Sequence, residues 1–429
     1  MTINHAAKTC QAGVKLSLLL ILASSLPTIA ATHKVADLSG HININATNSL
    51  NIDRPDSQIR VPLESLYQQL PNARSNAVIA MSGNRPLPSQ MLDTNMDGRA
   101  DTLTILADFS ARQTRTLSLY SADTLAPEAI PSNRTHAELA VRVGGRMNDK
   151  MRLEGGHYIN ARQFSIPADH SIGNKVFKYE GIGWESELVA YRFYFDHRSA
   201  TDVFGKIKPQ LALTQVGLDG GNYHSLGDWG MDILKVGPSV GVGAVAGFNH
   251  GQIVQLNQFS NAQATINNGP VLASAVLQHS HWQFGDISTD LSSRYAIAPG
   301  SRLTEVTARA PGVTQWIAGI VDHQVQRFVS ADTDKKWCYL ATYGKQSLAK
   351  DNLGLGVFYP CRQASGFVKE QQTDAVVLNL GTPPVHYYFF ANWSAEQDGA
   401  KDQQAFEQFL TDTRSRLNNP ILVKLAADQ

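Results

Sequence analysis

The sequence has little charge and no excess of either sign. Its 429 residues include 37 Lys and Arg against 37 Asp and Glu, and only 17% of the residues are charged. Long basic runs are missing as well. Nucleic acids and anionic lipid surfaces both require a positive patch on a protein. The composition therefore argues against nucleic acid or lipid as the partner.

Several enzyme motifs are also absent. The sequence has no G-x-S-x-G elbow, no H-E-x-x-H pair and no phosphate-binding P-loop. Its glycine-rich run, VGPSVGVGAVAGF, lacks the strand-to-helix context of a dinucleotide site. These absences argue against serine hydrolases, zinc proteases and nucleotide-dependent enzymes. Glycoside hydrolysis stays open, because two carboxylates from distant strands can pair without a local motif.

Long apolar runs are confined to the N-terminus, where LSLLLILASSL follows Lys8 and Lys15 and precedes Ala30 and Ala31. The run is short for a membrane span, and it has the charged start and small-residue end of a signal peptide. We expect a signal peptide over residues 1–31, with an uncleaved anchor as the alternative. The mature protein would then be periplasmic or secreted, without a membrane span.

Cysteine is scarce, with 3 in the chain. Cys10 precedes the apolar run, so cleavage would leave Cys338 and Cys361. In an exported protein such a pair most simply forms one disulfide. The absence of a C-x-x-C spacing argues against a zinc site.

Helical periodicity is rare, whereas short alternating runs bounded by Gly, Asn, Asp and Pro recur along the chain. This pattern predicts a mainly β protein, with a small antiparallel β sandwich over residues 33–125 and a large antiparallel β sandwich over residues 126–429. The clearest helix is KDQQAFEQFLTDTRSRLNNP, ended near Pro420. A shorter one is expected in DWGMDILKVG.

The segment SELVAYRFYFD separates two faces if it forms a strand. One face would carry Val189, Tyr191, Phe193 and Phe195, and the other Ala190, Arg192, Tyr194 and Asp196. The polar face could line a cleft in which Arg192 forks onto a uronate carboxylate and Tyr194 exchanges a proton. The alternative is an outer face on which Arg and Asp form a cross-strand ion pair.

The segment YHSLGDWGMD places Tyr223, His224, Asp228 and Asp232 around Trp229. A histidine among acids and aromatic rings can act as a general base or acid near neutral pH. Alternatively, His224 and Asp228 hydrogen-bond each other and cap a short helix.

In LQHSHWQF, alternation would place His279 and His281 on one strand face and Trp282 on the other. The histidine pair could address a substrate, or ligate a metal if a third ligand came from elsewhere.

The run DTNMDGRAD has alternating oxygen donors at Asp93, Asn95, Asp97 and Asp101, with a glycine at the turn. This is the pattern of the first half of a calcium loop. Thr104 stands where a bidentate glutamate would complete it. The alternatives are a structural calcium site and a polar hairpin, for which Asp-Gly is a strong signal.

The segments YEGIGWESELVAYRFYFDHRSATDVFGK and DWGMDILKVG, with DTNMDGRADTL and HYYFFANW, resemble a family of exported bacterial proteins catalogued as a domain of unknown function. Its members occur with genes for degrading uronic-acid-containing polysaccharides. The family is similar to the galactose-mutarotase and polysaccharide-lyase supersandwich group, usually with an Ig-like domain in front. The resemblance implies a Tyr or His that transfers protons and an Arg or Asn that neutralises the uronate.

We therefore expect a carbohydrate-active enzyme that acts on uronic-acid-containing saccharides by β-elimination or dehydration, with no cofactor required. The catalytic candidates are His224, Tyr223 and Arg192. The substrate-binding candidates are Trp184, Glu185, Tyr194, Asp196, Asp228, Trp229 and His281. A non-catalytic glycan-binding protein, a glycan hydrolase and an epimerase or mutarotase are the alternatives.

Overall fold

The computed structural model describes residues 38–74, 77–122, 132–167, 170–330, 334–381 and 384–426. The predicted signal peptide, and with it the predicted localisation, lies outside these residues. None of the helices within them is long and apolar enough to cross a membrane.

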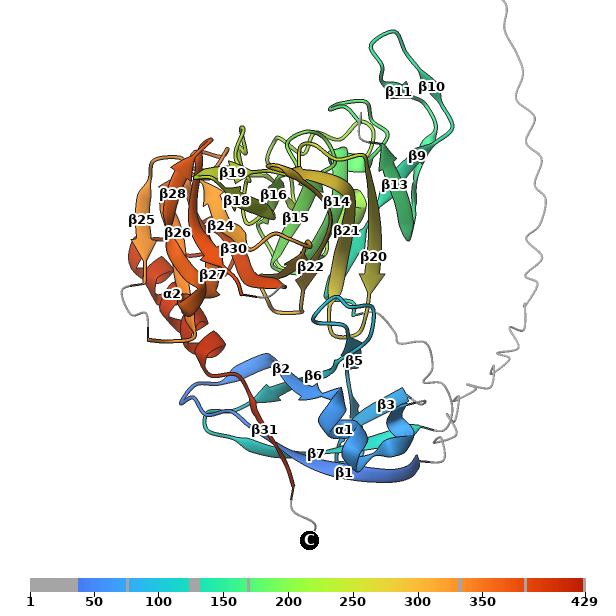
Figure 1. The fold of residues 1–429 in the computed structure, drawn as a ribbon, viewed down its shortest axis with the longest axis vertical. Helices are drawn as coiled ribbons and strands as arrows, with labels where there is room; N and C mark the ends of the chain where they lie inside the picture. Colours follow the sequence, from blue (N-terminus) through green and yellow to red (C-terminus); the bar gives the residue numbers. More distant parts are fainter. Residues whose placement is uncertain are drawn as a thin grey trace, which may run out of the picture. The chain divides into compact units, whose positions relative to one another are not determined.

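A nine-stranded sheet is the largest element of the fold (Figure 1). In spatial order its strands are β13 (Gln163–Pro167), β20 (Asn261–Asn268), β21 (Ala273–Phe284), β22 (Ile287–Ile297), β23 (Thr304–Arg309), β30 (Val385–Trp393), β27 (Asn352–Pro360), β26 (Trp337–Lys345) and β25 (Gln326–Val329). Neighbouring strands all pair antiparallel.

Two five-stranded sheets pack on one face of this large sheet. The first runs β17 (Gly230–Asp232), β16 (Thr201–Lys206), β15 (Val189–Tyr194), β14 (Gly181–Ser186) and β8 (Thr135–Glu138). The second runs β19 (Gln252–Val254), β18 (Ala246–Asn249), β24 (Gln315–Val321), β29 (Thr373–Asn379) and β28 (Ala364–Glu370).

Aromatic side chains fill the space between these layers. Trp184 of β14 stacks on Tyr295 of β22 with ring centroids 5.0 Å apart, and Trp282 of β21 lies 6.2 Å from Trp316 of β24. All four rings are fully buried in one continuous apolar core. Such large rings contribute heavily to the stability of a sandwich core.

A smaller β sandwich is built from two further sheets. One runs β31 (Leu422–Leu425), β1 (Leu38–Thr47), β7 (Thr114–Ala122), β3 (Ala77–Ser82) and β4 (Arg85–Leu87), and the other runs β2 (Arg54–Pro62), β6 (Thr102–Phe109) and β5 (Ser89–Leu92). They enclose a second apolar core.

The mainly β fold class predicted from the sequence is confirmed. The last strand, β31, joins the sheet that contains the first. The boundary placed at residues 125 and 126 falls between described segments and stays a prediction.

The predicted C-terminal helix is confirmed as α2 (Gln403–Asn418). The Asp402 side chain caps it by accepting a hydrogen bond from the Ala405 amide at 2.8 Å. Phe406 and Leu410 are buried against the outer face of β26, β27 and β30. A second helix, α1 (Leu63–Gln69), was not predicted, because SQIRVPLESL reads as one strand-like run.

The short helix expected in DWGMDILKVG is wrong. Residues Gly230–Asp232 form β17, which pairs with β16. Met231 points into the core while Asp232 joins the polar side chains on the opposite face. Pairing with β16 and burial of both faces therefore override the local helical spacing.

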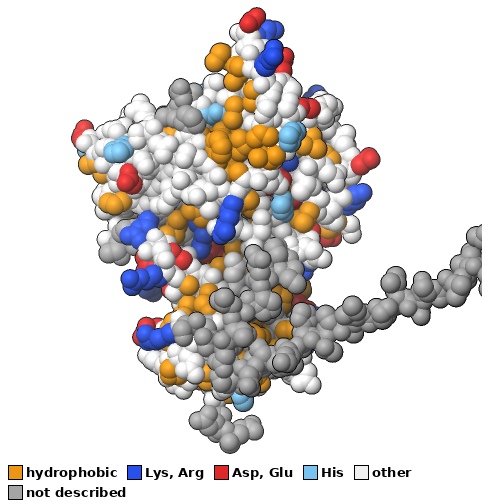
Figure 2. All heavy atoms as spheres, turned by 90° about the vertical axis from the view of Figure 1, so that its right-hand side faces the viewer, with side chains coloured by type: hydrophobic (Ala, Val, Ile, Leu, Met, Phe, Trp, Pro, Cys, Tyr) orange, Lys and Arg blue, Asp and Glu red, His pale blue; other side chains and the backbone are white. Residues whose placement is uncertain are grey.

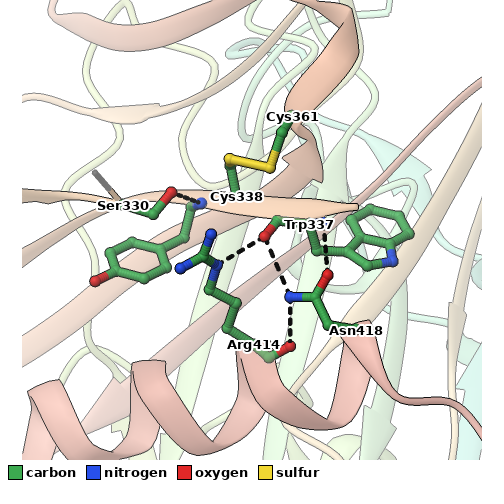
Figure 3. Close-up of a disulfide and its surroundings, with 7 residues drawn as sticks. Ser330, Trp337, Cys338, Cys361, Arg414 and Asn418 are labelled. Atoms are coloured by element: carbon green, nitrogen blue, oxygen red, sulfur yellow. Dashed lines mark hydrogen bonds between the residues drawn. A yellow bond between two sulfur atoms is a disulfide. The ribbon is translucent and has the colours of Figure 1, made fainter. Parts of the chain in front are cut away.

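The Cys338–Cys361 disulfide is present as predicted, where β26 begins and β27 ends (Figure 3). Helix α2 docks beside it, because Arg414 donates a hydrogen bond to the Trp337 carbonyl at 2.7 Å. The Trp337 amide in turn donates to the Asn418 side chain at 3.0 Å. The first residues of β26 are thus held from both sides.

A hairpin of β10 (Arg146–Met147) and β11 (Leu153–Glu154) projects beyond β9 (Ala140–Val143) and β12 (His157–Asn160) (Figure 1). Hydrophobic side chains gather on the face of the molecule shown in Figure 2, below this arm. Met147 and Met151 of the hairpin and Ile159 of β12 are exposed, as is Ile172, which follows β13.

Candidate functional site

Polar side chains line the outer face of the sheet formed by β8, β14, β15, β16 and β17. Strand alternation turns one set of residues into the core and the other set outward. The outward set is His136, Glu138, Glu185, Arg192, Tyr194, Asp202, Lys206 and Asp232. Segment 207–229 covers much of this face, and most of these side chains are consequently buried.

Arg192 is the centre of this outer face and is fully buried. Its guanidinium donates to Asp202 at 2.6 Å and 3.1 Å, and to Asp232 at 2.7 Å. The predicted strand phase is thus confirmed, but two aspartates already occupy the fork. Arg192 therefore cannot clamp a substrate carboxylate in this arrangement.

His224 connects this buried network to solvent. Its Nδ1 lies 3.1 Å from an oxygen of Asp232, while the histidine side chain is 59% exposed and the aspartate 3%. The Tyr223 ring lies 4.3 Å from the His224 ring, and its hydroxyl accepts a hydrogen bond from Arg192 at 3.3 Å. The three predicted catalytic candidates therefore converge on one spot.

The pKa values of His224, Asp202 and Tyr223 are all raised. The hydrogen bond to Asp232 raises the pKa of His224. Burial, with the nearby Asp232 charge, raises the pKa of Asp202 to about 6. Burial also raises the pKa of Tyr223, against the opposing effect of Arg192. Clustered displacements of this kind are typical of catalytic sites.

The backbone beside the network is strained. Tyr179 and Glu180 are consecutive non-glycine residues with φ of 41° and 68°. The bend lets the Tyr179 hydroxyl pass over Gly183 and donate to Glu138 at 2.7 Å. Strained backbone is often retained where a functional group must be positioned.

The other substrate-binding candidates divide into buried and accessible groups. Trp184 lies in the core, where its indole N–H donates to Thr304 at 2.9 Å. Glu185 is buried with Lys206 and accepts the amides of residues 212 and 213. Neither can stack on or contact a sugar in this arrangement.

Tyr194 and Asp196 are buried as well. Tyr194 donates to Asp202, and Asp196 pairs with Arg198. Trp229 is half-buried and Asp228 is exposed. Only these last two remain accessible beside His224.

His281 does not join this cluster. A β-bulge between His279 and Trp282 gives His281 a φ of 55° and shifts the alternation. His279 and Trp282 are consequently both buried, and His281 is exposed, with Nδ1 2.9 Å from the Ser260 hydroxyl. The prediction that the two histidines share a face is wrong. Burial lowers the pKa of His279 to about 4, so it is neutral at physiological pH.

The DTNMDGRAD loop is a turn held by its own carboxylates. Asp93 accepts the amides of Asp97 and Gly98, and Asp101 accepts those of Thr94 and Asn95. Among the described residues, no group of three or more His, Cys, Asp or Glu side chains is arranged to hold a metal ion. Calcium at this loop stays a prediction.

A cleft of about 790 Å³ lies between the smaller sandwich, the nine-stranded sheet and α2. Arg60 pairs there with the buried Glu305, and His386 Nε2 lies 3.3 Å from the same carboxylate. The rings of His386 and Tyr388 are 5.0 Å apart. Sequence reasoning missed this site, because its residues come from widely separated segments and carry no local motif.

Two solved structures have limited structural similarity to this chain. They are a protein in the glycosyl hydrolase family 38 from Enterococcus faecalis and an alpha-mannosidase from Enterococcus faecalis V583. Each is 9% identical with a TM-score of 0.42 and covers 91% of this chain. The chain spans about half of their lengths, 48% and 46% respectively.

No curated protein matches the sequence. A family model described as "Domain of unknown function (DUF4861)" matches residues 46–423. Since this match covers most of the 429 residues, the chain belongs to the DUF4861 family.

Proposed function

We propose that this protein is a carbohydrate-active enzyme that transfers protons on uronic-acid-containing saccharides, using His224 and Tyr223. The observation that carries the proposal is the convergence of an exposed histidine, a buried aspartate and a phenol at one point. Nδ1 of His224 faces Asp232, so the aspartate orients the ring and leaves Nε2 to the substrate. We also propose that the fold of this chain is related to the galactose-mutarotase and polysaccharide-lyase supersandwich group.

In a β-elimination, neutral His224 accepts the C5 proton of the uronate. The C4–O bond then breaks, a C4–C5 double bond forms, and the leaving oxygen takes the proton of the Tyr223 hydroxyl. The Arg192 guanidinium favours this donation, because its hydrogen bond to the phenol oxygen stabilises the phenolate. Dehydration is the same sequence with a hydroxyl as the leaving group.

Arg192 is a positioning residue in this scheme. It holds Asp202 and Asp232 in place and fixes the Tyr223 oxygen, but it has no free donor pair for the substrate. Half-buried Trp229 and exposed Asp228 are the neighbouring groups available to a sugar ring and its hydroxyls.

The test is an ultraviolet assay for unsaturated uronate with oligogalacturonate and oligoglucuronate substrates, backed by chromatography of the products. We expect His224→Ala and Tyr223→Phe each to lower the rate about 10²- to 10⁴-fold, the range of a single general acid or base. His157→Ala, an exposed histidine on β12, is the matched control and should keep the wild-type rate.

The product decides between reaction types. Shortened chains without new absorbance would indicate hydrolysis, and a changed anomer or epimer without cleavage would indicate isomerisation; either would overturn the elimination mechanism. Binding without any product would indicate a glycan-binding protein. Full activity in both His224→Ala and Tyr223→Phe would show that the chemistry takes place elsewhere.

A further inference from the structure

We propose that the cleft between the smaller sandwich, the nine-stranded sheet and α2 is a separate binding site for the oxyanion group of an acidic saccharide, held by Arg54 and Arg416. The volume of about 790 Å³ falls within the usual range for small-ligand sites. The site does not involve His224, Tyr223 or Arg192, so it is independent of the proposed chemistry.

The cleft carries an excess of positive charge, although the whole chain is neutral. Five basic and two acidic side chains line it. Both acids are already paired, Glu305 with Arg60 and Asp56 with Arg134 at 2.6 Å. Arg302, another lining residue, pairs with Glu396 behind the wall.

Three lining cations remain after this pairing: Arg54, Lys336 and Arg416. Within the described parts of the chain, no carboxylate forms an ion pair with any of them. Lys336 and Arg416 are exposed, whereas Arg54 is only 9% exposed. The cleft therefore presents unneutralised cations at both its surface and its floor.

Arg54 is the most informative of these residues. One guanidinium nitrogen, Nη1, donates to the Asn419 carbonyl at 2.6 Å, but its buried Nε has no hydrogen-bond partner among the described residues. Burial lowers the pKa of Arg54, and the like charge of Arg416 lowers it further. Burying a cation without an anion is costly, so a bound oxyanion would relieve both the desolvation and the repulsion.

The remaining wall carries the half-buried rings of His386 and Tyr388, which are backed by the buried Trp337. Trp337, His386 and Tyr388 form a contiguous aromatic group with ring centroids 5.0 to 5.4 Å apart. Helix α2 and the disulfide hold the backbone at Trp337, so this wall is rigid (Figure 3). Cations beside aromatic and imidazole groups are what a carboxylated or sulfated saccharide requires.

Isothermal titration calorimetry tests the site with three probes of equal length: oligogalacturonate, a sulfated oligosaccharide and a neutral oligosaccharide. We expect both anionic probes, or one of them, to bind and the neutral one not to bind. Preference between the two anions identifies carboxylate or sulfate ester as the group recognised.

Arg54→Gln and Arg416→Gln should each weaken this binding about tenfold, which corresponds to about 1.4 kcal/mol for one charge-assisted hydrogen bond. The matched control is Arg85→Gln, an exposed arginine on β4 of the smaller sandwich outside the cleft. His224→Ala should bind the probes as the wild type does, and this separates failure of the cleft from failure of the catalytic proposal.

Arg416 is exposed on α2, so its variant should fold even if Arg54→Gln does not. Equal binding of neutral and anionic probes, or unchanged affinity in Arg416→Gln, would overturn the proposal. Loss of binding in Arg85→Gln as well would show a nonspecific charge effect and overturn it too.

Discussion

At the scale of single residues, Gly183 keeps open the space through which Tyr179 reaches Glu138. A Cβ at this position would lie 2.6 Å from the Tyr179 hydroxyl, far closer than atoms pack. We expect Gly183→Ala to displace the tyrosine and lower the free energy of unfolding by about 1–3 kcal/mol, as overpacking does. Urea denaturation measures this loss. Gly366→Ala is the control, since nothing lies within 4 Å of a Cβ there; an equal loss in both variants would contradict this account.

The pKa of His224 is a second residue-scale prediction. Because Asp232 raises it, the pKa measured by NMR titration of the ring should lie above the ordinary value of 6.5. Asp232→Asn removes the negative charge, so the pKa should fall. If His224 is the base, the acid limb of the pH–rate profile should follow the same shift, because only the neutral ring accepts a proton.

The raised pKa of His224 also sets how its contribution to stability changes with pH. A histidine whose folded pKa is raised adds stability that is complete below its unfolded pKa and is lost as the pH rises through the folded pKa. The side chain is mostly exposed, so this contribution should be small. A His224 pKa at or below 6.5 in the folded protein would contradict the Asp232 contact.

Arg192 gives a third prediction. Arg192→Met would leave Asp202 and Asp232 buried without their cation, and removing one partner of a buried pair costs about 3–5 kcal/mol. The pKa of Asp202, already about 6, should rise further, so the destabilisation should be larger at pH 8 than at pH 5. Denaturant unfolding at both pH values measures this. A pH-independent loss would mean that packing, not charge, is the contribution of Arg192.

At the scale of elements, the sequence correctly predicted the features that depend on local residue patterns. Alternation in β15 correctly separated the core-facing Tyr191 and Phe193 from the outward Arg192. Helical periodicity that ends near Pro420 likewise located α2. Alternation could not show that segment 207–229 covers the outward face, because that contact depends on tertiary packing.

The errors have the same origin. One segment was assigned the wrong structure, and one correctly predicted strand the wrong side-chain facing, where long-range pairing decided the conformation. Pairing with β16 made a strand of Gly230–Asp232, and a bulge in β21 brought Trp282 into the core and left His281 outside. Neither event leaves a signal in a short window of sequence.

The disulfide supplies an element-scale prediction. It closes a loop with a sequence separation of 23, for which chain entropy gives about 3 kcal/mol. We expect reduction of the protein to lower the free energy of unfolding by about this amount. The double variant Cys338→Ala/Cys361→Ala should show the same loss and no further response to reductant. A full response in that variant would show that the reductant acts elsewhere.

At the scale of the whole molecule, the cleft shows why a site can escape sequence analysis entirely. Its proposed binding residues, Arg54 on β2 and Arg416 on α2, are far apart in the chain, and the fold brings them close enough for their charges to repel. Charge counted over the full sequence is zero, and this balance hides a local excess. Only the folded arrangement shows which cationic side chains have no carboxylate as an ion-pair partner.

The contribution of β31 to stability can be tested by truncating the chain before this strand. Residues Leu422–Leu425 pair with β1 at its outer edge, and the Ala426 amide donates to Asn43 at 2.9 Å. A chain ending at Ile421 should lose these ladder bonds and about 2 kcal/mol of stability, at about 0.5–1.5 kcal/mol for each hydrogen bond lost. Amide exchange should then rise at Asn45 and Thr47, which face β31 as Asn43 does, whereas Ile44 and Ala46 keep their pairing with β7.

A chain ending at Ala426 is the control for this truncation, since it keeps β31 intact and should match the full-length protein. The same pair of chains bears on the cleft. Arg416 precedes β31 by only a few residues, so release of the strand should loosen its position and weaken anion binding as well. Lost stability with unchanged anion affinity would mean that α2 alone, through Trp337 and Asn418, holds Arg416 in place. Lost stability with weaker binding would mean that the closing strand of the smaller sandwich also shapes the cleft.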